Sequence, residues 1–179
     1  MRNFWIGLLV GLSLPAMGGY LFLASGLMPV ATRGAPLPLE RRLAQMALHA
    51  AIGHAEDQLS PLPADEPNLI AGAKIYQKQC AICHGVPGGE STAIAKGMFP
   101  PPPQLFQRMG VTDDSVGETF WKVRNGIRLT GMPGFEQSLN ETEMWQVSQL
   151  LKNAHALPPT VRAGLTPSYS IDSPRAKSP

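Results

Sequence analysis

The sequence predicts an all-α protein, and three observations carry that prediction. Apolar residues recur at helical spacing in several segments between residues 39 and 157, and no segment shows the strict alternation of a half-buried strand. The chain begins with a long apolar run, because no Asp, Glu, Lys, Arg or His lies between Arg2 and Arg33. Gly and Pro number 18 each among 179 residues, so irregular segments must separate the helices.

The composition excludes several classes of protein. Apolar residues make up 44% of the chain, which is enough to form one core. Charged residues make up only 16%, which excludes a disordered acidic tail protein. The formal net charge of +2 is too small for binding to nucleic acid by phosphate neutralisation. Only two cysteines are present, which rules out a disulfide framework and a four-cysteine zinc site.

Residues 1–31 are expected to form a transmembrane anchor. The apolar run from Phe4 to Ala31 exceeds the roughly 20 residues that a membrane-spanning helix needs. A cleaved signal peptide is the alternative, because Ala24-Ser25-Gly26 offers a small-x-small cleavage site. The apolar part of a signal peptide is usually shorter, so the sequence favours an uncleaved anchor.

Three further zones follow the anchor. Residues 32–67 are expected to form a linker and an extension helix from Leu39 to Leu59, which the prolines up to Pro67 terminate. Residues 68–157 are expected to form the main domain. Its predicted helices run over 68–80, from 114 to 125, and from 140 to the region before Pro158. Residues 158–179 are rich in Pro and Ser and are predicted to be a disordered tail.

One motif carries chemistry. Cys80-Ala81-Ile82-Cys83-His84 is C-x-x-C-H, the pattern of covalent attachment of a c-type haem. Two thiols three residues apart at a helix end can both reach the vinyl groups of one haem, and the adjacent imidazole of His84 then points at the iron. A thioredoxin-like site would need a βαβ context, and a zinc site would need two more soft ligands. The motif therefore predicts one covalently bound haem, with Cys80, Cys83 and His84 as cofactor-binding residues.

The sixth ligand of such an iron is predicted to be Met132. It lies between two helices in a loop that Pro133 stiffens, and its flanking glycines allow a close approach. A thioether favours Fe(II) and raises the reduction potential. Met98 and Met109 are weaker candidates: Met98 is expected to be too close in sequence to His84 to reach the opposite haem face, and Met109 lacks the rigid loop. The remaining histidines are expected at the surface or at a helix end: His49, His54 and His155.

Two other groups near the motif have more than one interpretation. The proline run Pro100 to Pro103 is either a rigid linker or a wall on the proximal side of the haem, where a backbone carbonyl would accept from His84 Nδ1. Basic residues precede the methionine loop, and they either neutralise haem propionates, face an acidic partner, or form a solvated helix face: Lys122, Arg124 and Arg128. Trp121 and Trp145 are expected in the core.

These motifs occur in the order found in a known family. C-x-x-C-H, the helix segment Gly72–Tyr76, Asn125-Gly126-Ile127-Arg128, Thr130-Gly131-Met132-Pro133 and the helix around Trp145 together resemble class I cytochrome c, most of all the membrane-anchored bacterial monohaem type. The resemblance covers residues 68–157. It implies three to four helices around one haem c, with the first and last helices crossing near Gly72 and Trp145. It also implies thioethers from both cysteines, axial ligands His84 and Met132, and one-electron transfer without a small-molecule substrate.

The resemblance also implies a location and partners. Three arginines follow the anchor and one precedes it, so the positive-inside rule alone would put the main domain in the cytoplasm. In this bacterial class c-type haem is attached outside the cytoplasmic membrane, so we expect a single-pass inner-membrane protein with a periplasmic haem domain. Expected partners are an oxidase, a quinol-oxidising complex or a dehydrogenase. The alternatives are a haem subunit of a larger membrane oxidoreductase, or an open-site haem sensor or peroxidatic protein.

Overall fold

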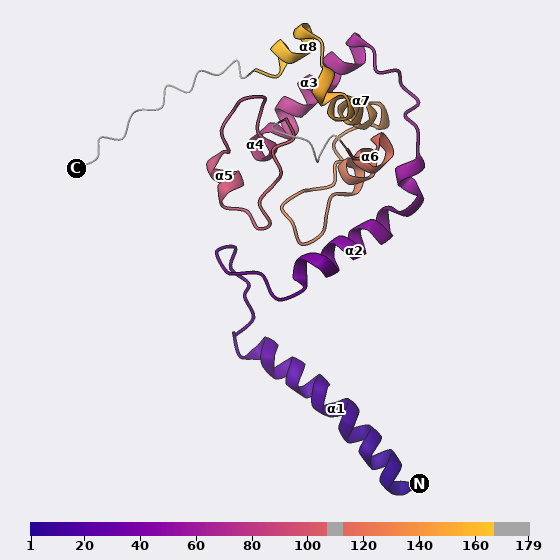
Figure 1. The fold of residues 1–179 in the computed structure, drawn as a ribbon, viewed down its shortest axis with the longest axis vertical. Coiled ribbons are helices and arrows are strands. Elements are labelled where there is room, and N and C mark those ends of the chain that lie inside the picture. The colour runs from indigo at the N-terminus through magenta and orange to yellow at the C-terminus, as the bar shows by residue number, and fades with distance from the viewer. Residues whose placement is uncertain (107–112, 167–179) are drawn as a thin grey trace, which may run out of the picture. The chain divides into compact units, whose positions relative to one another are not determined.

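The fold was obtained as a computed structural model, which describes residues 1–106 and 113–166 (Figure 1). The chain divides into two compact units, Met1–Ala44 and Gln45–Pro179, and each is described by itself. Every regular element within the described ranges is a helix, as the sequence predicts.

The first unit is dominated by the helix α1, Arg2–Ala24, none of whose residues is buried. It is long and apolar enough to cross a membrane by length and composition, with Pro15 in its interior. At 1.5 Å per residue it spans about 34 Å, close to the thickness of a bilayer's hydrocarbon core. The helix ends before the predicted limit of the anchor, since Gly26 adopts a φ of +75° shortly after its last turn.

The extension is shorter than predicted. The α-helix α2 runs over Glu40–Ile52, and the 3-10 helix η1, Gly53–Asp57, follows it in place of a continuous helix to Leu59. Gly53 has a φ of +47°, which breaks the right-handed α-helical path at this point. Ile52 is buried, whereas the rest of α2 is exposed or half-buried.

The second unit contains three main helices. These are α3 (Glu66–Gln79), α6 (Val116–Asn125) and α7 (Glu141–Lys152). α3 begins two residues before its predicted start, because the Asp65 carboxylate accepts from Asn68 N at 3.1 Å. α7 begins with the predicted capping box, in which Asn140 and Glu143 each accept from the other's backbone nitrogen.

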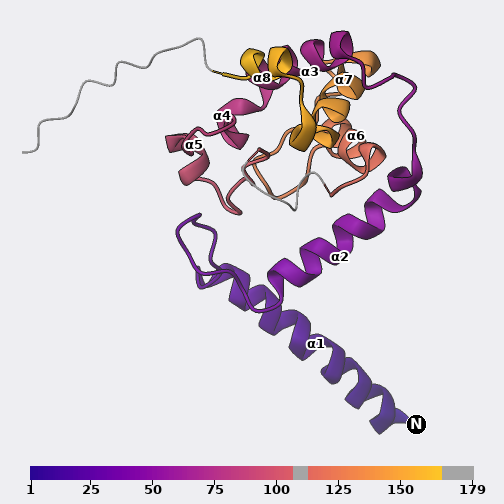
Figure 2. The same cartoon turned by 45° about the horizontal axis from the view of Figure 1, so that its top comes forward.

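Short helices complete this unit: α4 (Ala81–His84), α5 (Ala93–Lys96), the 3-10 helix η2 (Ala154–Ala156) and α8 (Pro159–Gly164). α3 packs chiefly on α7, α7 also packs on α6, and α8 packs on α3 (Figures 1 and 2). The segment from α4 through α5 to residue 106 and the loop from α6 to α7 leave the helical layer on one side, as Figure 2 shows. These two loops carry the candidate site.

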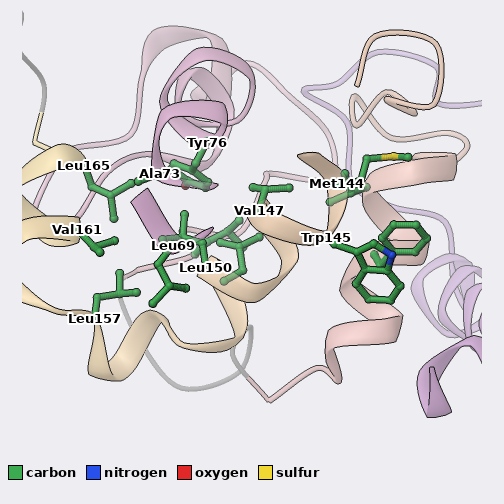
Figure 3. Packing of buried hydrophobic residues seen from close by; sticks show 14 of the residues in the cluster. Leu69, Ala73, Tyr76, Met144, Trp145, Val147, Leu150, Leu157, Val161 and Leu165 are labelled. Atoms are coloured by element: carbon green, nitrogen blue, oxygen red, sulfur yellow. The ribbon is translucent and has the colours of Figure 1, made fainter. Parts of the chain in front are cut away.

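The core lies between α3, α6, α7 and α8 (Figure 3). α3 and α7 approach most closely at Gly72, where an added Cβ would lie 2.3 Å from Gln146 O. This crossing is one residue from the expected position at Trp145, whose side chain is buried and stacks on Phe120 with ring centroids 3.9 Å apart. The contact explains why glycine occupies position 72: any side chain would separate the two helices.

The prediction of disorder from Pro158 onward is wrong for the first part of that segment. Residues 159–164 form α8, and the side chains of Val161 and Leu165 are fully buried (Figure 3). Gln77 Nε2 also donates to Thr166 O at 3.1 Å, which ties the end of this segment to α3. The sequence signal was weak because only two large apolar residues, four apart, hold the helix. The rest of the predicted tail, 167–179, lies outside the described residues.

Candidate functional site

The C-x-x-C-H motif sits at the corner between α3 and α4. Cys80 ends α3 and begins α4, and its carbonyl accepts from Cys83 N at 3.1 Å and from His84 N at 2.9 Å. This single helical turn places residues 80, 83 and 84 on one face, since residues three and four apart are neighbours on a helix. Both cysteines are free and half-buried. The turn thus presents two thiols and one imidazole together, as covalent haem attachment requires.

The orientation of His84 is fixed by the proline run. His84 Nδ1 lies 2.8 Å from Pro103 O, so that the ring donates its Nδ1 proton to this carbonyl. Burial lowers the pKa of His84, and the bond to Pro103 acts in the opposite direction. A neutral ring with its proton on Nδ1 leaves the Nε2 lone pair for a metal. One of the two interpretations of the proline run gave this role to a backbone carbonyl, and the structure identifies it as that of Pro103.

Three further contacts hold the motif rigid. Tyr76 OH donates to Gly85 O at 2.7 Å, and burial raises the pKa of this phenol well above its usual range. Thr92 Oγ1 donates to Ile82 O at 2.6 Å, so the loop after the motif folds back over it. Gly85 has a φ of +71°, and the Gln104 amide occupies the space where a Cβ would lie. The peptide after His84 therefore has one available conformation.

The thiol of Cys80 is poorly suited to ionisation. Burial, with a smaller contribution from neighbouring Cys83, raises the pKa of Cys80 to about 12. A thiol that stays protonated at neutral pH is neither a reactive redox cysteine nor a ready thiolate ligand of zinc. Within residues 1–106 and 113–166 no three His, Cys, Asp or Glu side chains form a group that could hold a metal ion. The donor set fits a covalently attached haem, with His84 as the ligand to its iron.

The methionine loop is anchored to the end of α6. Ile127 N donates to Met132 O at 3.2 Å, and Met132 N donates to Thr130 Oγ1 at 3.1 Å. Gly126 has a φ of +68°, and an added Cβ there would lie 2.4 Å from Gly134 N and 2.8 Å from Met132 O. The turn after α6 and the loop backbone at 132–134 are therefore packed together without room for a side chain. This arrangement gives the half-buried Met132 a fixed position.

Met98, a weaker candidate ligand, reaches the same loop. An added Cβ at Gly131 would lie 1.9 Å from Met98 Cε, so the end of this side chain covers Gly131 directly before Met132. α5 and the residues after it carry the chain to this loop (Figure 1). Met109, the other candidate ligand, lies outside the described residues.

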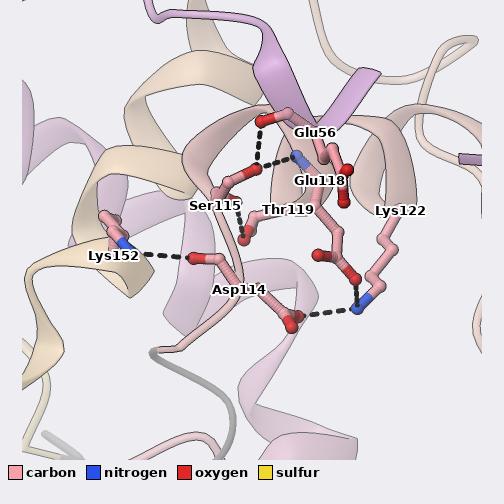
Figure 4. Close-up of polar contacts among 7 residues, drawn as sticks. All are labelled: Glu56, Asp114, Ser115, Glu118, Thr119, Lys122 and Lys152. Carbon is pink, nitrogen blue, oxygen red and sulfur yellow. Dashed lines mark hydrogen bonds and ion pairs between the residues drawn. The ribbon is translucent and has the colours of Figure 1, made fainter. Parts of the chain in front are cut away.

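The basic residues before the methionine loop are partly neutralised within the chain. Lys122 Nζ lies 2.6 Å from Asp114 Oδ2 and 2.7 Å from Glu118 Oε1, and these carboxylates outweigh burial and raise the pKa of Lys122 (Figure 4). Arg124 donates through Nε to Glu136 at 3.0 Å. For these two residues the structure favours a structural role over a surface for an acidic partner. His49, His54 and His155 are exposed, as expected.

The sequence reasoning did not find Tyr76, Thr92 and Gln104 as residues that position the site. Tyr76 and Thr92 act through their hydroxyl groups on backbone carbonyls, and Gln104 Nε2 lies 3.4 Å from Cys83 O. Such contacts join segments 9 to 21 residues apart in the chain and follow no spacing rule. The one available signal was that a polar residue, Gln104, directly follows the proline run.

Comparison with known proteins bears on the family to which the domain belongs. Residues 67–151 match the family model described as cytochrome C oxidase, cbb3-type, subunit III. No curated protein sequence matches the chain. Among solved structures, a chain of a reducing HAO-like protein complex from Kuenenia stuttgartiensis is 22% identical, with a TM-score of 0.45. That match covers 66% of the present chain and 61% of the other, so the chain corresponds to less than two thirds of that protein's length.

The matched range contains the haem-attachment motif, the proline run, the methionine loop and the packed helices α3, α6 and α7. An all-helical fold, a C-x-x-C-H turn and a histidine oriented for metal binding all agree with the match. Residues 67–151 form a class I c-type cytochrome domain, the haem-binding domain of an electron-transfer protein.

Proposed function

We propose that this protein is a membrane-tethered one-electron carrier with one haem c bound through Cys80 and Cys83 and with His84 and Met132 as axial ligands. The observation that carries the proposal is the bond from His84 Nδ1 to Pro103 O, because it leaves Nε2 available and holds the ring on the C-x-x-C-H turn. The haem, when bound, supplies the Fe(III)/Fe(II) couple.

The residues of the chain have separate roles in this site. Cys80 and Cys83 would hold the haem through thioether bonds to its two vinyl groups. His84 Nε2 is the proximal ligand, and its bond to Pro103 increases its basicity. The thioether of Met132 is a weak donor that favours the ferrous state and raises the potential. The contacts that hold His84 and Met132 would keep both side chains in nearly the same position in the two oxidation states.

The proposed location is the periplasmic face of the bacterial inner membrane. α1 has the length and apolar composition of a membrane span, and covalent haem attachment places the domain after it outside the cytoplasm in the family that the chain resembles. Tethering would confine the domain to the membrane surface and raise its effective concentration near membrane-bound partners. Suitable partners are a terminal oxidase, a quinol-oxidising complex or a dehydrogenase.

A second candidate function is a haem subunit of a larger membrane oxidoreductase. The observation that favours it is the matched family model, whose description is that of an oxidase subunit. This candidate keeps the same haem site and differs only in permanent association. Mild-detergent purification of the tagged chain distinguishes the two: stoichiometric subunits that remain through gel filtration indicate a complex, and a homogeneous single chain indicates a carrier.

The ligand assignment is tested with two methionine variants. The oxidised protein, produced with the haem-attachment machinery, should show the weak red-end charge-transfer band that methionine sulfur gives to ferric haem. Met132→Leu should abolish the band, lower the reduction potential and allow carbon monoxide to bind the reduced form. Met98→Leu is the matched control, because Met98 touches the same loop at Gly131, and it should retain the band.

Each other outcome has a distinct meaning for the proposal. Loss of the band in Met98→Leu alone would transfer the ligand role to Met98. A wild type without the band that binds carbon monoxide readily would indicate an open iron site and a sensor or peroxidatic function. Covalent attachment is checked separately, since a variant carrying both Cys80→Ala and Cys83→Ala should lose all haem that survives acid-acetone extraction.

A further inference from the structure

The core carries a phenol hydroxyl next to the haem-attachment turn. It belongs to Tyr76, whose side chain is fully buried in the hydrophobic cluster (Figure 3). Its ring packs edge-on against Phe106, with the ring centroids 5.0 Å apart. Tyr76 lies four residues after Gly72, so both residues share the face of α3 that packs on α7. The crossing of these two helices at Gly72 therefore fixes the position of the hydroxyl.

The hydroxyl donates to the carbonyl of Gly85, the residue directly after His84. The two oxygens lie 2.7 Å apart. Gly85 is buried and adopts φ +71° and ψ −175°, a conformation that is essentially restricted to glycine. A buried carbonyl needs a hydrogen-bond partner, and Tyr76 supplies it. Because burial raises the pKa of Tyr76 well above its usual value, the phenol remains a donor at neutral and mildly alkaline pH.

Gly85 also contacts the proline run, through Gln104. The amide of Gln104 occupies the space where a Cβ of Gly85 would lie, and its Nε2 is 3.4 Å from Cys83 O. Gln104 directly follows Pro103, whose carbonyl accepts from His84 Nδ1. A displacement of Gly85 would therefore move both partners of that bond. His84 would move through the shared main chain, and Pro103 would move through the side chain of the next residue.

We propose that Tyr76 is a positioning residue for the axial histidine: by holding Gly85, its hydroxyl sets the strength of the bond from His84 Nδ1 to Pro103 O and hence the reduction potential. The inference rests on iron ligation by His84, which is part of the proposed function. A strong bond at Nδ1 makes the imidazole a better electron donor at Nε2, and a better donor stabilises Fe(III). Loosening the bond should therefore raise the potential, and strengthening it should lower the potential.

Tyr76→Phe tests the proposal, because it removes the hydroxyl and keeps the ring that packs on Phe106. The full-length haem-loaded chain is labelled with ¹⁵N-histidine, reduced, and studied by NMR in detergent. The exchange rate of the His84 Nδ1 proton with water reports on the bond to Pro103 directly. The other three histidines do not interfere, because they are exposed and their ring protons exchange fast: His49, His54 and His155. The reduction potential is measured on the same samples.

The His84 Nδ1 proton should be protected in the wild type. In Tyr76→Phe it should exchange roughly three- to tenfold faster, the factor that corresponds to the net contribution of one hydrogen bond. The reduction potential of this variant should rise. If the hydroxyl only satisfied a buried carbonyl, its removal would lower the stability of the domain and leave both of these quantities unchanged.

Thr92→Val is the matched control for general loosening of the turn. Thr92 Oγ1 donates to Ile82 O at 2.6 Å and accepts from Ala95 N, so the variant also removes a hydroxyl that binds the C-x-x-C-H turn. Its acceptor precedes His84 and has no contact with the proline run through Gly85. Thr92→Val should therefore lose stability while the exchange rate and the potential stay at the wild-type values. Changes as large as those of Tyr76→Phe would overturn the proposal.

A second measurement reverses the sign of the effect and does not depend on the folding of a variant. Production of the wild-type sequence with 3-fluorotyrosine makes the phenol of Tyr76 a stronger donor to Gly85 O. The His84 Nδ1 proton should then exchange more slowly, and the potential should fall. The same labelling of Tyr76→Phe controls for the other two tyrosines and should change neither quantity. A fluorotyrosine shift that persists in Tyr76→Phe would refute the assignment to Tyr76.

The outcomes separate this inference from the proposed function. Covalent haem with a protected His84 ring proton, together with wild-type exchange and potential in Tyr76→Phe, would refute the role of Tyr76 and leave the proposed function intact. A haem-loaded wild type without a protected His84 ring proton would contradict the oriented histidine on which the proposed function depends. That result would overturn both proposals.

Discussion

Gly126→Ala should be among the most damaging single substitutions in the domain. Gly126 has a φ of +68° and a ψ of −175°, a region of backbone space that is essentially restricted to glycine. Strain of this kind costs about 1–3 kcal/mol. The added Cβ would also lie 2.4 Å from Gly134 N and 2.6 Å from Pro133 C, and these are backbone atoms that cannot rotate away. Overpacking adds about 1–3 kcal/mol, so we expect a total loss of roughly 2–6 kcal/mol.

Denaturant unfolding of the oxidised, detergent-solubilised haem protein measures this loss through helical circular dichroism. Gly88→Ala is the matched control, because Gly88 has a φ of +72° but nothing within 4 Å of an added Cβ. The difference between the two variants therefore isolates the steric part of the effect. Because the clash lies at the methionine loop, Gly126→Ala should also weaken the methionine charge-transfer band. The reasoning is refuted if Gly126→Ala is no less stable than Gly88→Ala.

Three further predictions concern the packing of the domain. Gly72→Ala should lower the free energy of unfolding by about 1–2 kcal/mol, because its Cβ would meet Gln146 O at 2.3 Å, and this outweighs the better helix propensity of alanine. Gly164→Ala, with open space around it, should be nearly neutral in the same unfolding assay. Ser115→Ala should cost about 1–2 kcal/mol by removing the cap of α6 and the bond to Glu56 O, and an effect as small as that of Ser138→Ala would contradict this. Gly131→Ala should be tolerated, since the atom in its way is the flexible end of Met98; a loss as large as that of Gly126→Ala in thermal unfolding would show that Met98 cannot move.

Much of the fold could be predicted because local signals agree with the tertiary structure. The capping box at Asn140 and Glu143 forms as expected, and the Asn125-Gly126 pair ends α6 where the sequence indicates. The C-x-x-C-H motif is also local, since one helical turn brings both thiols and the imidazole to one face. Such features depend on the backbone within five residues and therefore follow from the sequence.

Other expectations failed where a few distant contacts outweigh local composition. The segment after Pro158 resembles a disordered tail, yet burial of Val161 and Leu165 against the core holds it as α8. The extension was expected to be one helix, but Gly53 and the close packing of η1 on α6 at Gly117 give it a 3-10 end. The contact of Met98 with Gly131 is likewise a tertiary contact that the local sequence does not indicate.

The sequence alone determined the helical class, the apolar N-terminal helix and the residues suited to bind haem, because each of these depends on composition or on spacing within one or two turns. Only the tertiary structure decided that Pro103 orients His84, that Tyr76 and Gln104 fix the motif, and that Met98 and Met132 meet at one loop. These contacts join segments whose separation in the chain follows no repeat. They arise because the packing of α3 on α7 at Gly72 fixes where the intervening loops can run.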